Sequence, residues 1–242
     1  MQILSIGNSF SQDAQTYLYR MAKNMFTVNL FIGGCSLETH YRNMLGDKQA
    51  YNLEVCDIRT GFPMSIKEAL LSRKWDVITL QQVSSASFRY ESYMPYIKEL
   101  AAYVRKCNPA AKLYIHETWG YESGSEKIER MGFRTMEEMS ERVFATYARV
   151  AEEIGADGII PSGHGLLALS KAQDKPVHRD GSHAEEGIGR YMLGCVWYET
   201  LTGKPAPEDF SDFDVEVTPE EAALVREIAH KTVTEFLQTQ RG

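Results

Sequence analysis

The 242-residue sequence lacks the features that would place it in several large classes of protein. It has only four cysteines, widely spaced and without a Cys-x-x-Cys pair, which is not the pattern of a zinc or redox site. Basic residues are in deficit, because 26 Lys and Arg stand against 33 Asp and Glu and give a net charge of −7. This charge argues against a nucleic acid or an anionic membrane as partner. No apolar run approaches the ~18 residues that span a bilayer.

Linkers and targeting signals are also missing. The chain has no Pro/Gly/Ser-rich linker, internal repeat or low-complexity tract, so we expect a single domain over residues 1–242. The N-terminus lacks the charged region and cleavage site of a leader. We therefore expect a soluble protein, either cytoplasmic or secreted or periplasmic with its leader removed. The sequence does not indicate an oligomeric state.

What the sequence does contain is an alternation of short apolar runs, which predict strands, with segments of helical periodicity. The expected strands are 2–6, 26–32, 75–80, 112–116 and 157–160. The expected helices are 12–24, 64–73, 91–107, 135–154, 184–202 and 219–238. Short apolar strands that alternate with helices are typical of an α/β protein whose parallel sheet is covered on both faces.

Two long connections, 33–62 and 118–134, show little periodicity of either kind. Loops of this length in a compact domain usually belong to a binding site. The second connection follows the fourth expected strand, where it could act as a lid.

Residues 2–12, QILSIGNSFSQ, join the first strand to the first helix through a tight turn with Ser9 at its apex. In an open α/β sheet, reacting groups gather at the carboxyl ends of the strands. A serine at the start of a helix has free backbone N–H groups and the helix dipole beside it, and both stabilise negative charge. Two interpretations are open. Either Ser9 is a nucleophile, or the turn is an ordinary one in which Ser9 or Ser11 caps the helix.

A second motif, Asp180-Gly181-Ser182-His183, precedes a helix that is expected to begin near Ala184. An aspartate can hold one imidazole nitrogen while the other nitrogen faces a hydroxyl group. Taken alone, the motif is short, and Asp180 could instead cap the helix. Its value comes from its combination with Ser9.

The two motifs together resemble the SGNH (GDSL-like) hydrolases, and more narrowly a bacterial branch known mainly as a domain of unknown function (DUF4886). Six landmarks of that branch occur in order along the chain. They are Ser9 in ILSIGNSFS, Gly33-Gly34, Leu80-Gln81, Thr118-Trp119, Pro161 with Gly163, and Asp180 with His183 ahead of Trp197-Tyr198-Glu199.

The resemblance implies a flavodoxin-like, three-layer α/β/α sandwich around a five-stranded parallel sheet. It also implies that Ser9 is the nucleophile, His183 the general base and Asp180 the partner that orients His183. No cofactor is implied. The expected activity is that of a serine esterase that hydrolyses a small acyl ester through an acyl-enzyme, with a carbohydrate O-acetyl ester as the first candidate.

In the family, the oxyanion is held by the N–H of the serine, a glycine N–H after the second strand and a side-chain amide after the third. The glycine corresponds to Gly33 or Gly34, and Gly34 is preferred because it directly precedes the next segment. The amide departs from the family's usual asparagine, since this chain has Gln81 and Gln82 there. Successive side chains of a strand point to opposite faces, so one glutamine is expected to serve. We assign Gln81, with Gln82 as the alternative or as a substrate contact.

Other side chains leave further alternatives. Trp119 either lines a substrate pocket or packs in the core. His164 and His178 stand near the crevice, but their spacing matches no closed zinc site, so we expect no metal. The substrate is expected to be a small molecule or a glycan ester. Competing functions are a non-catalytic carbohydrate-binding domain on the same fold and a lipase or thioesterase of the same family.

Overall fold

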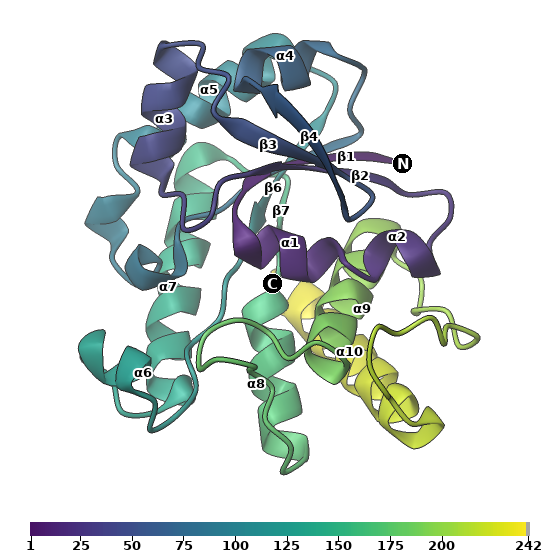
Figure 1. The fold of residues 1–242 in the computed structure, drawn as a ribbon. Coiled ribbons are helices and arrows are strands. Elements are labelled where there is room, and N and C mark those ends of the chain that lie inside the picture. Colours follow the sequence, from purple (N-terminus) through teal and green to yellow (C-terminus); the bar gives the residue numbers. More distant parts are fainter. Residues whose placement is uncertain (241–242) are drawn as a thin grey trace.

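The centre of the molecule is one twisted sheet, described here in a computed structural model of residues 1–240 (Figure 1). Its strands are β1 (Gln2–Gly7), β2 (Phe26–Phe31), β3 (Tyr51–Val55), β4 (Ile58–Met64), β5 (Val77–Leu80), β6 (Lys112–His116) and β7 (Gly158–Ile160). Their order across the sheet is β4-β3-β2-β1-β5-β6-β7. The stretch β2-β1-β5-β6-β7 is parallel, whereas β3 and β4 are joined to it by antiparallel pairs.

Helices cover both faces of this sheet. They are α1 (Ser9–Gln15), α2 (Leu18–Met21), α3 (Leu37–Leu45), α4 (Ile66–Leu71), α5 (Tyr96–Cys107), α6 (Glu126–Arg130), α7 (Met136–Ile154), α8 (Ser162–Ala172), α9 (Ile188–Thr202) and α10 (Pro219–Thr239), with short 3₁₀ turns at η1 (Ser84–Ala86) and η2 (Tyr90–Ser92). On one face α5 packs against α3, α4 and α7, and on the other α9 packs against α1, α2, α8 and α10 (Figure 1). Helix α9 is buried along most of its length because other helices surround it. No helix within residues 1–240 is both long and apolar enough to cross a bilayer.

The predicted fold class is confirmed. All five expected strands are present, and they form the parallel part of the sheet in the three-layer α/β/α arrangement. The predicted strand count is wrong, because β3 and β4 extend the sheet to seven strands. The connection expected over 33–62 is not a loop, because it contains α3, β3 and most of β4.

The β3–β4 hairpin was missed because it lacks the usual signals. Its outer strand β4 is mostly exposed and carries Pro63, so it shows no apolar run. The turn between the strands is made by Cys56 and Asp57, whose φ angles are 50° and 67°. Two successive positive φ angles are what a tight hairpin turn requires, but Asn-Gly or Asp-Gly is the sequence that normally marks it.

Several helix boundaries also differ from the expectation. The helix expected over 12–24 is divided into α1 and α2, and α9 begins at Ile188 rather than near Ala184. The connection 118–134 contains the single-turn helix α6. Helix α8 was not predicted, since Gly163 and Gly165 lower helix propensity at its start.

The first turn of the chain depends on a close approach at Gly7, the last residue of β1. A Cβ atom at Gly7 would lie 2.0 Å from Ser11 Oγ and 3.0 Å from Ser11 Cβ. That hydroxyl accepts a hydrogen bond from the Asn8 N–H (3.0 Å) and donates to Asn29 Oδ1 on β2 (3.0 Å). Glycine is therefore required where the strand passes into α1, because the hydroxyl cannot move without losing these bonds.

We expect Gly7→Ala to destabilise the protein by about 1–3 kcal/mol, because the added methyl group overpacks a fixed site. Urea unfolding of the variant measures this loss. Gly33→Ala is the matched control, because a Cβ there would meet nothing closer than Phe31 Cζ at 3.9 Å. Equal unfolding free energies for the two variants would contradict the requirement for glycine at position 7.

Candidate active site

The turn after β1 presents Ser9 as the first residue of α1. The cap of this helix is Asn8, whose side-chain oxygen accepts from the Phe10 N–H (3.0 Å), while Ser11 Oγ accepts from the Asn8 N–H. The Ser9 hydroxyl takes no part in this capping box. Asn8 and Ser11 therefore cap the helix, and the Ser9 hydroxyl is not used for capping.

Ser9, His183 and Asp180 lie in a hydrogen-bonded row. Ser9 Oγ is 2.9 Å from His183 Nε2, and His183 Nδ1 is 2.7 Å from Asp180 Oδ2. A carboxylate only accepts hydrogen bonds, so Asp180 holds the proton on Nδ1 and leaves the Nε2 lone pair facing the serine hydroxyl. The side chains of His183 and Asp180 are 28% and 43% exposed, so the row opens to solvent.

The loop that carries this histidine is shaped by Asp180 itself. Asp180 Oδ1 accepts hydrogen bonds from the backbone N–H groups of Ser182 (3.1 Å) and His183 (2.9 Å). Gly181, which directly follows Asp180, has a φ of 82°. Residues with a side chain disfavour this conformation, which explains the glycine in the Asp-Gly-Ser-His motif. Asp180 does not cap α9, whose first turn is capped by Glu185 through the N–H groups of Gly187 and Gly189.

Lys127 on α6 also contacts this aspartate, which was not predicted. Its Nζ is 3.1 Å from Asp180 Oδ1 and 2.9 Å from Ser182 Oγ. Burial alone would raise the pKa of Asp180, but the hydrogen bonds from His183, Lys127 and Ser182 hold it well below its usual range. Asp180 is therefore a carboxylate at every pH at which the site could work. Position 127 gave no signal, because a lysine in a charged stretch normally lies free in solvent.

Phe10 packs against the His183 ring and is itself stacked on Trp119. Phe10 contacts the His183 ring edge-on, with centroids 5.6 Å apart, and stacks on Trp119 at 4.0 Å. Trp119 is fully buried, and its Nε1 donates to the Ser182 carbonyl (2.8 Å). Of the two alternatives for Trp119, the structure favours packing, and the predicted substrate contact has no support in this geometry.

A buried ion cluster fixes the same loop to α1. Asp13 is fully buried, and its carboxylate contacts Arg179 Nη1 (3.0 Å) and Arg190 Nε (3.0 Å). Asp13 Oδ2 also accepts a hydrogen bond from the Ala184 N–H (3.2 Å). Residue 184 directly follows His183, so the cluster sets the position of the histidine. Asp13 was not predicted, although a lone acid among the buried positions of a helix can be recognised as a signal.

The candidate oxyanion donors surround Asn8. Asn8 Nδ2 donates to the Cys35 carbonyl (3.1 Å), which brings the exposed Gly34 in the loop after β2 next to the serine turn. Gln81 Nε2, at the end of β5, donates to Asn8 Oδ1 (2.7 Å). The expected set Ser9, Gly34 and Gln81 is thus gathered at the carboxyl ends of β1, β2 and β5.

Gln82, the alternative donor, faces away from this turn. Its Oε1 accepts from the N–H groups of Leu37 (2.9 Å) and Val83 (2.8 Å), and its Nε2 donates to Ser92. Gln81 and Gln82 are equally buried, at 1% exposure each, but only Gln81 bonds directly to Asn8 of the serine turn. The geometry therefore favours Gln81 as the donor and gives Gln82 a structural role instead of the predicted substrate contact.

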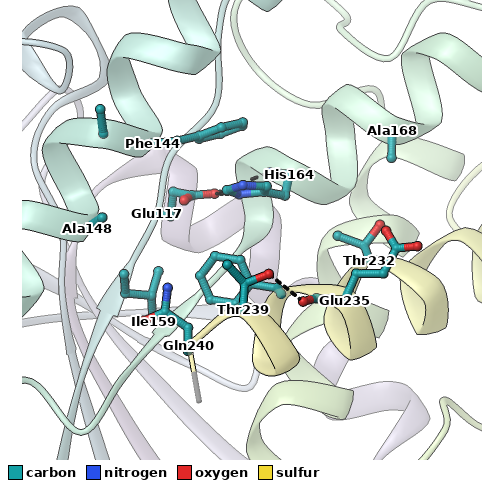
Figure 2. Close-up of a pocket in the computed structure, with 12 residues that line it drawn as sticks. Glu117, Phe144, Ala148, Ile159, His164, Ala168, Thr232, Glu235, Thr239 and Gln240 are labelled. Carbon is teal, nitrogen blue, oxygen red and sulfur yellow. Dashed lines mark hydrogen bonds and ion pairs between the residues drawn. The ribbon is translucent and has the colours of Figure 1, made fainter. Parts of the chain in front are cut away.

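A second titratable pair lies apart from the serine, in a cavity of about 470 Å³ lined by α7, α8 and α10 (Figure 2). Glu117 Oε1 accepts from the ring (2.8 Å) and the backbone N–H (3.2 Å) of His164, and Phe144 stacks on that imidazole at 3.7 Å. No residue of the Ser9 row lines this cavity. Over residues 1–240, no group of three or more His, Cys, Asp and Glu side chains is arranged to hold a metal ion.

We expect Asp13→Asn to cost up to about 3–5 kcal/mol of unfolding free energy, because it leaves two largely buried guanidinium groups without their counter-charge. Urea unfolding measures this cost. Asp214→Asn is the matched control, since Asp214 pairs with Arg20 at a more exposed site where an ion pair contributes about 0–1 kcal/mol. A loss for Asp13→Asn no larger than that of the control would show that the cluster does not hold the loop.

Comparison with known proteins identifies the family of the chain. The chain matches the family described as a domain of unknown function, DUF4886, over residues 2–232. A solved structure of a DUF4886 family protein from Bacteroides uniformis aligns with a TM-score of 0.86 and 31% identity over 97% of this chain and 95% of that chain. No curated protein matches.

More distant structures share the fold. A protein described as a candidate SGNH hydrolase from Slackia heliotrinireducens aligns with a TM-score of 0.64 and 21% identity, over 83% of this chain and 98% of that chain. An acetylxylan esterase from Geobacillus stearothermophilus aligns with a TM-score of 0.57 and 11% identity, over 82% and 92%. The predicted resemblance is confirmed: the chain belongs to the DUF4886 family and has the fold of the SGNH hydrolases.

Proposed function

We propose that the protein is a serine hydrolase of the SGNH type that cleaves small acyl esters through an acyl-enzyme. The observation that carries this proposal is the row Ser9–His183–Asp180, with distances of 2.9 and 2.7 Å. A non-catalytic domain on this fold would have no reason to keep all three groups in hydrogen-bond contact across 174 residues of sequence. The row has the connectivity of nucleophile, general base and orienting acid.

In the first half of the reaction, Ser9 Oγ attacks the carbonyl carbon of the ester while His183 Nε2 takes the hydroxyl proton. Asp180 keeps the imidazole in the required tautomer and stabilises the imidazolium that forms. The negative charge that develops on the carbonyl oxygen is stabilised by N–H groups of Ser9, Gly34 and Gln81, each worth roughly 3–4 kcal/mol in comparable sites. Imidazolium then donates its proton to the leaving oxygen, and the alcohol departs.

In the second half, a water molecule attacks the acyl group on Ser9. His183 Nε2 accepts a proton from this water, and the same three N–H groups stabilise the second tetrahedral intermediate. When the intermediate collapses, His183 returns the proton to Ser9 Oγ and the carboxylic acid is released. The free enzyme is restored without any cofactor.

We propose carbohydrate O-acetyl esters as the first substrate class to test. The site is open, since Asp180 and His183 are partly exposed and Gly34 lies at the surface, which suits an ester carried on a larger alcohol. Structural neighbours named as acetylxylan esterases have the same fold. Because fold alone does not identify a substrate, lipids and thioesters belong in the same panel.

We expect the wild type to hydrolyse p-nitrophenyl acetate and Ser9→Ala to lose this activity, by a factor on the order of 10⁶ if chemistry limits the rate. Release of p-nitrophenol measures both rates. Ser211→Ala is the control, because Ser211 is exposed and distant in sequence from the row. A Ser9→Ala rate equal to that of the wild type would exclude Ser9 as the nucleophile.

The pH dependence follows from the electrostatics of the row. Because hydrogen bonds hold the pKa of Asp180 well below its usual range despite the cost of burial, Asp180 stays ionised as the pH falls from 8 to 5. The proposed base works only while the His183 imidazole is neutral, because protonation removes the Nε2 lone pair that takes the serine proton. We expect log kcat/KM to fall with a slope of one on the acid side.

The measurement is kcat/KM for p-nitrophenyl acetate between pH 5 and 8. A flat profile would contradict the role of His183. A slope of two would mean that Asp180 also takes a proton in this range, against the direction of its pKa shift.

A further inference from the structure

A chain of buried hydrogen bonds runs from α9 to the serine turn, across the ends of three strands. Its members are Trp197, Ser162, His116, Gln81 and Asn8, and each is at most 2% exposed. The successive distances are 3.2 Å (Trp197 Nε1 to Ser162 Oγ), 3.0 Å (Ser162 Oγ to His116 Nε2), 2.7 Å (His116 Nδ1 to Gln81 Oε1) and 2.7 Å (Gln81 Nε2 to Asn8 Oδ1).

The direction of the chain is set at its α9 end by Trp197, because an indole N–H can only donate. Ser162 Oγ accepts that bond. Within residues 1–240, the acceptor for the hydroxyl proton of Ser162 is His116 Nε2. The imidazole is fully buried, and burial lowers its pKa to about 3, so the ring is neutral. A neutral ring that accepts at Nε2 carries its proton on Nδ1 and donates it to Gln81 Oε1.

The other end of the chain sets the same direction independently. The Phe10 N–H donates to Asn8 Oδ1, and Asn8 Nδ2 donates to the Cys35 carbonyl, so the orientation of the Asn8 amide is fixed by two backbone groups. Its oxygen therefore faces Gln81, which has to offer its NH₂ group there. A reversed Gln81 amide would set oxygen against oxygen at Asn8 and N–H against N–H at His116.

We propose that Trp197, Ser162 and His116 are positioning residues that hold the Gln81 carboxamide with its nitrogen toward the serine turn. This inference rests on the proposed function. One N–H of Gln81 Nε2 is used by Asn8, and the second is the one that would reach the oxyanion. A donor that is already oriented costs no reorganisation when charge develops, whereas a reversed amide would present a carbonyl oxygen to that charge.

The test compares two substitutions of similar size at position 116. Asparagine can place its Nδ2 near the position of the imidazole Nδ1 and keep the donor to Gln81, whereas leucine has no donor. We expect His116→Leu to lower kcat for p-nitrophenyl acetate by about 10–100-fold with little change in KM, as part of the roughly 10²–10³-fold that loss of a whole oxyanion donor costs. His116→Asn is expected to recover most of that loss.

A double-mutant cycle separates positioning from general support of the fold. In a Gln81→Leu background, which removes the donor itself, His116→Leu should lower kcat no further, because there is no amide left to orient. A merely structural role would give the same additional loss in both backgrounds. Equal kcat for wild type and His116→Leu would also overturn the inference.

The tautomer of His116 gives a readout that needs no activity. We expect ¹⁵N NMR of the imidazoles to show His116 neutral between pH 5 and 8 with its proton on Nδ1, the signal being assigned by its loss in His116→Asn. A proton on Nε2 would overturn the inference even if the leucine variant fails to fold.

Wild-type turnover that disappears in Ser9→Ala, together with an Nε2 proton, would reject the inference and leave the proposed function standing. If the wild type shows neither turnover nor labelling of Ser9 by a fluorophosphonate, the proposed function is rejected. The positioning role of Trp197, Ser162 and His116 would then be rejected with it.

Discussion

The candidate site depends on one buried carboxylate, Asp13, which joins α1 to the loop that carries His183. Asp13 lies four residues after Ser9 in α1, so the two side chains share a face of the helix. The same carboxylate is neutralised by Arg179 and Arg190 and accepts the Ala184 N–H. The loop that holds His183 is therefore docked on the face that presents the nucleophile. A contact of 2.9 Å between residues 174 positions apart follows from this anchor.

Much of the site could be predicted because it lies where an α/β sheet always gathers its reacting groups. Short apolar strands predicted the parallel sheet, and parallel strands end at one edge, which placed Ser9 there. Gly34 and Gln81 were assigned through the resemblance to the SGNH hydrolases. The turn of the Asp-Gly-Ser-His motif is local, since it is closed by the Asp180 side chain and by Gly181. The motif alone left its role open, and the roles of Asp180 and His183 were predicted from the resemblance.

The parts that could not be predicted depend on distant partners. The hairpin β3–β4 lies at the sheet edge, where exposure removes the apolar signal, and its turn uses Cys56 and Asp57 in place of the usual residues. Lys127, a surface-type residue, became part of the site only because α6 folds back on the Asp180 loop. Likewise, no local pattern separates a core tryptophan from a pocket tryptophan. For Trp119, packing is favoured by its stack on Phe10, which only the folded structure shows.

The central claim is that Ser9 is a nucleophile activated by His183. Its most direct test is intact-mass and peptide mass spectrometry after reaction with a fluorophosphonate, performed on the wild type and on His183→Ala. We expect one phosphonyl group per chain, located on the peptide that contains Ser9, and a labelling rate that falls sharply when His183 is removed. An unlabelled wild type, a label on another residue, or labelling of Ser9 at the same rate without His183 would contradict it.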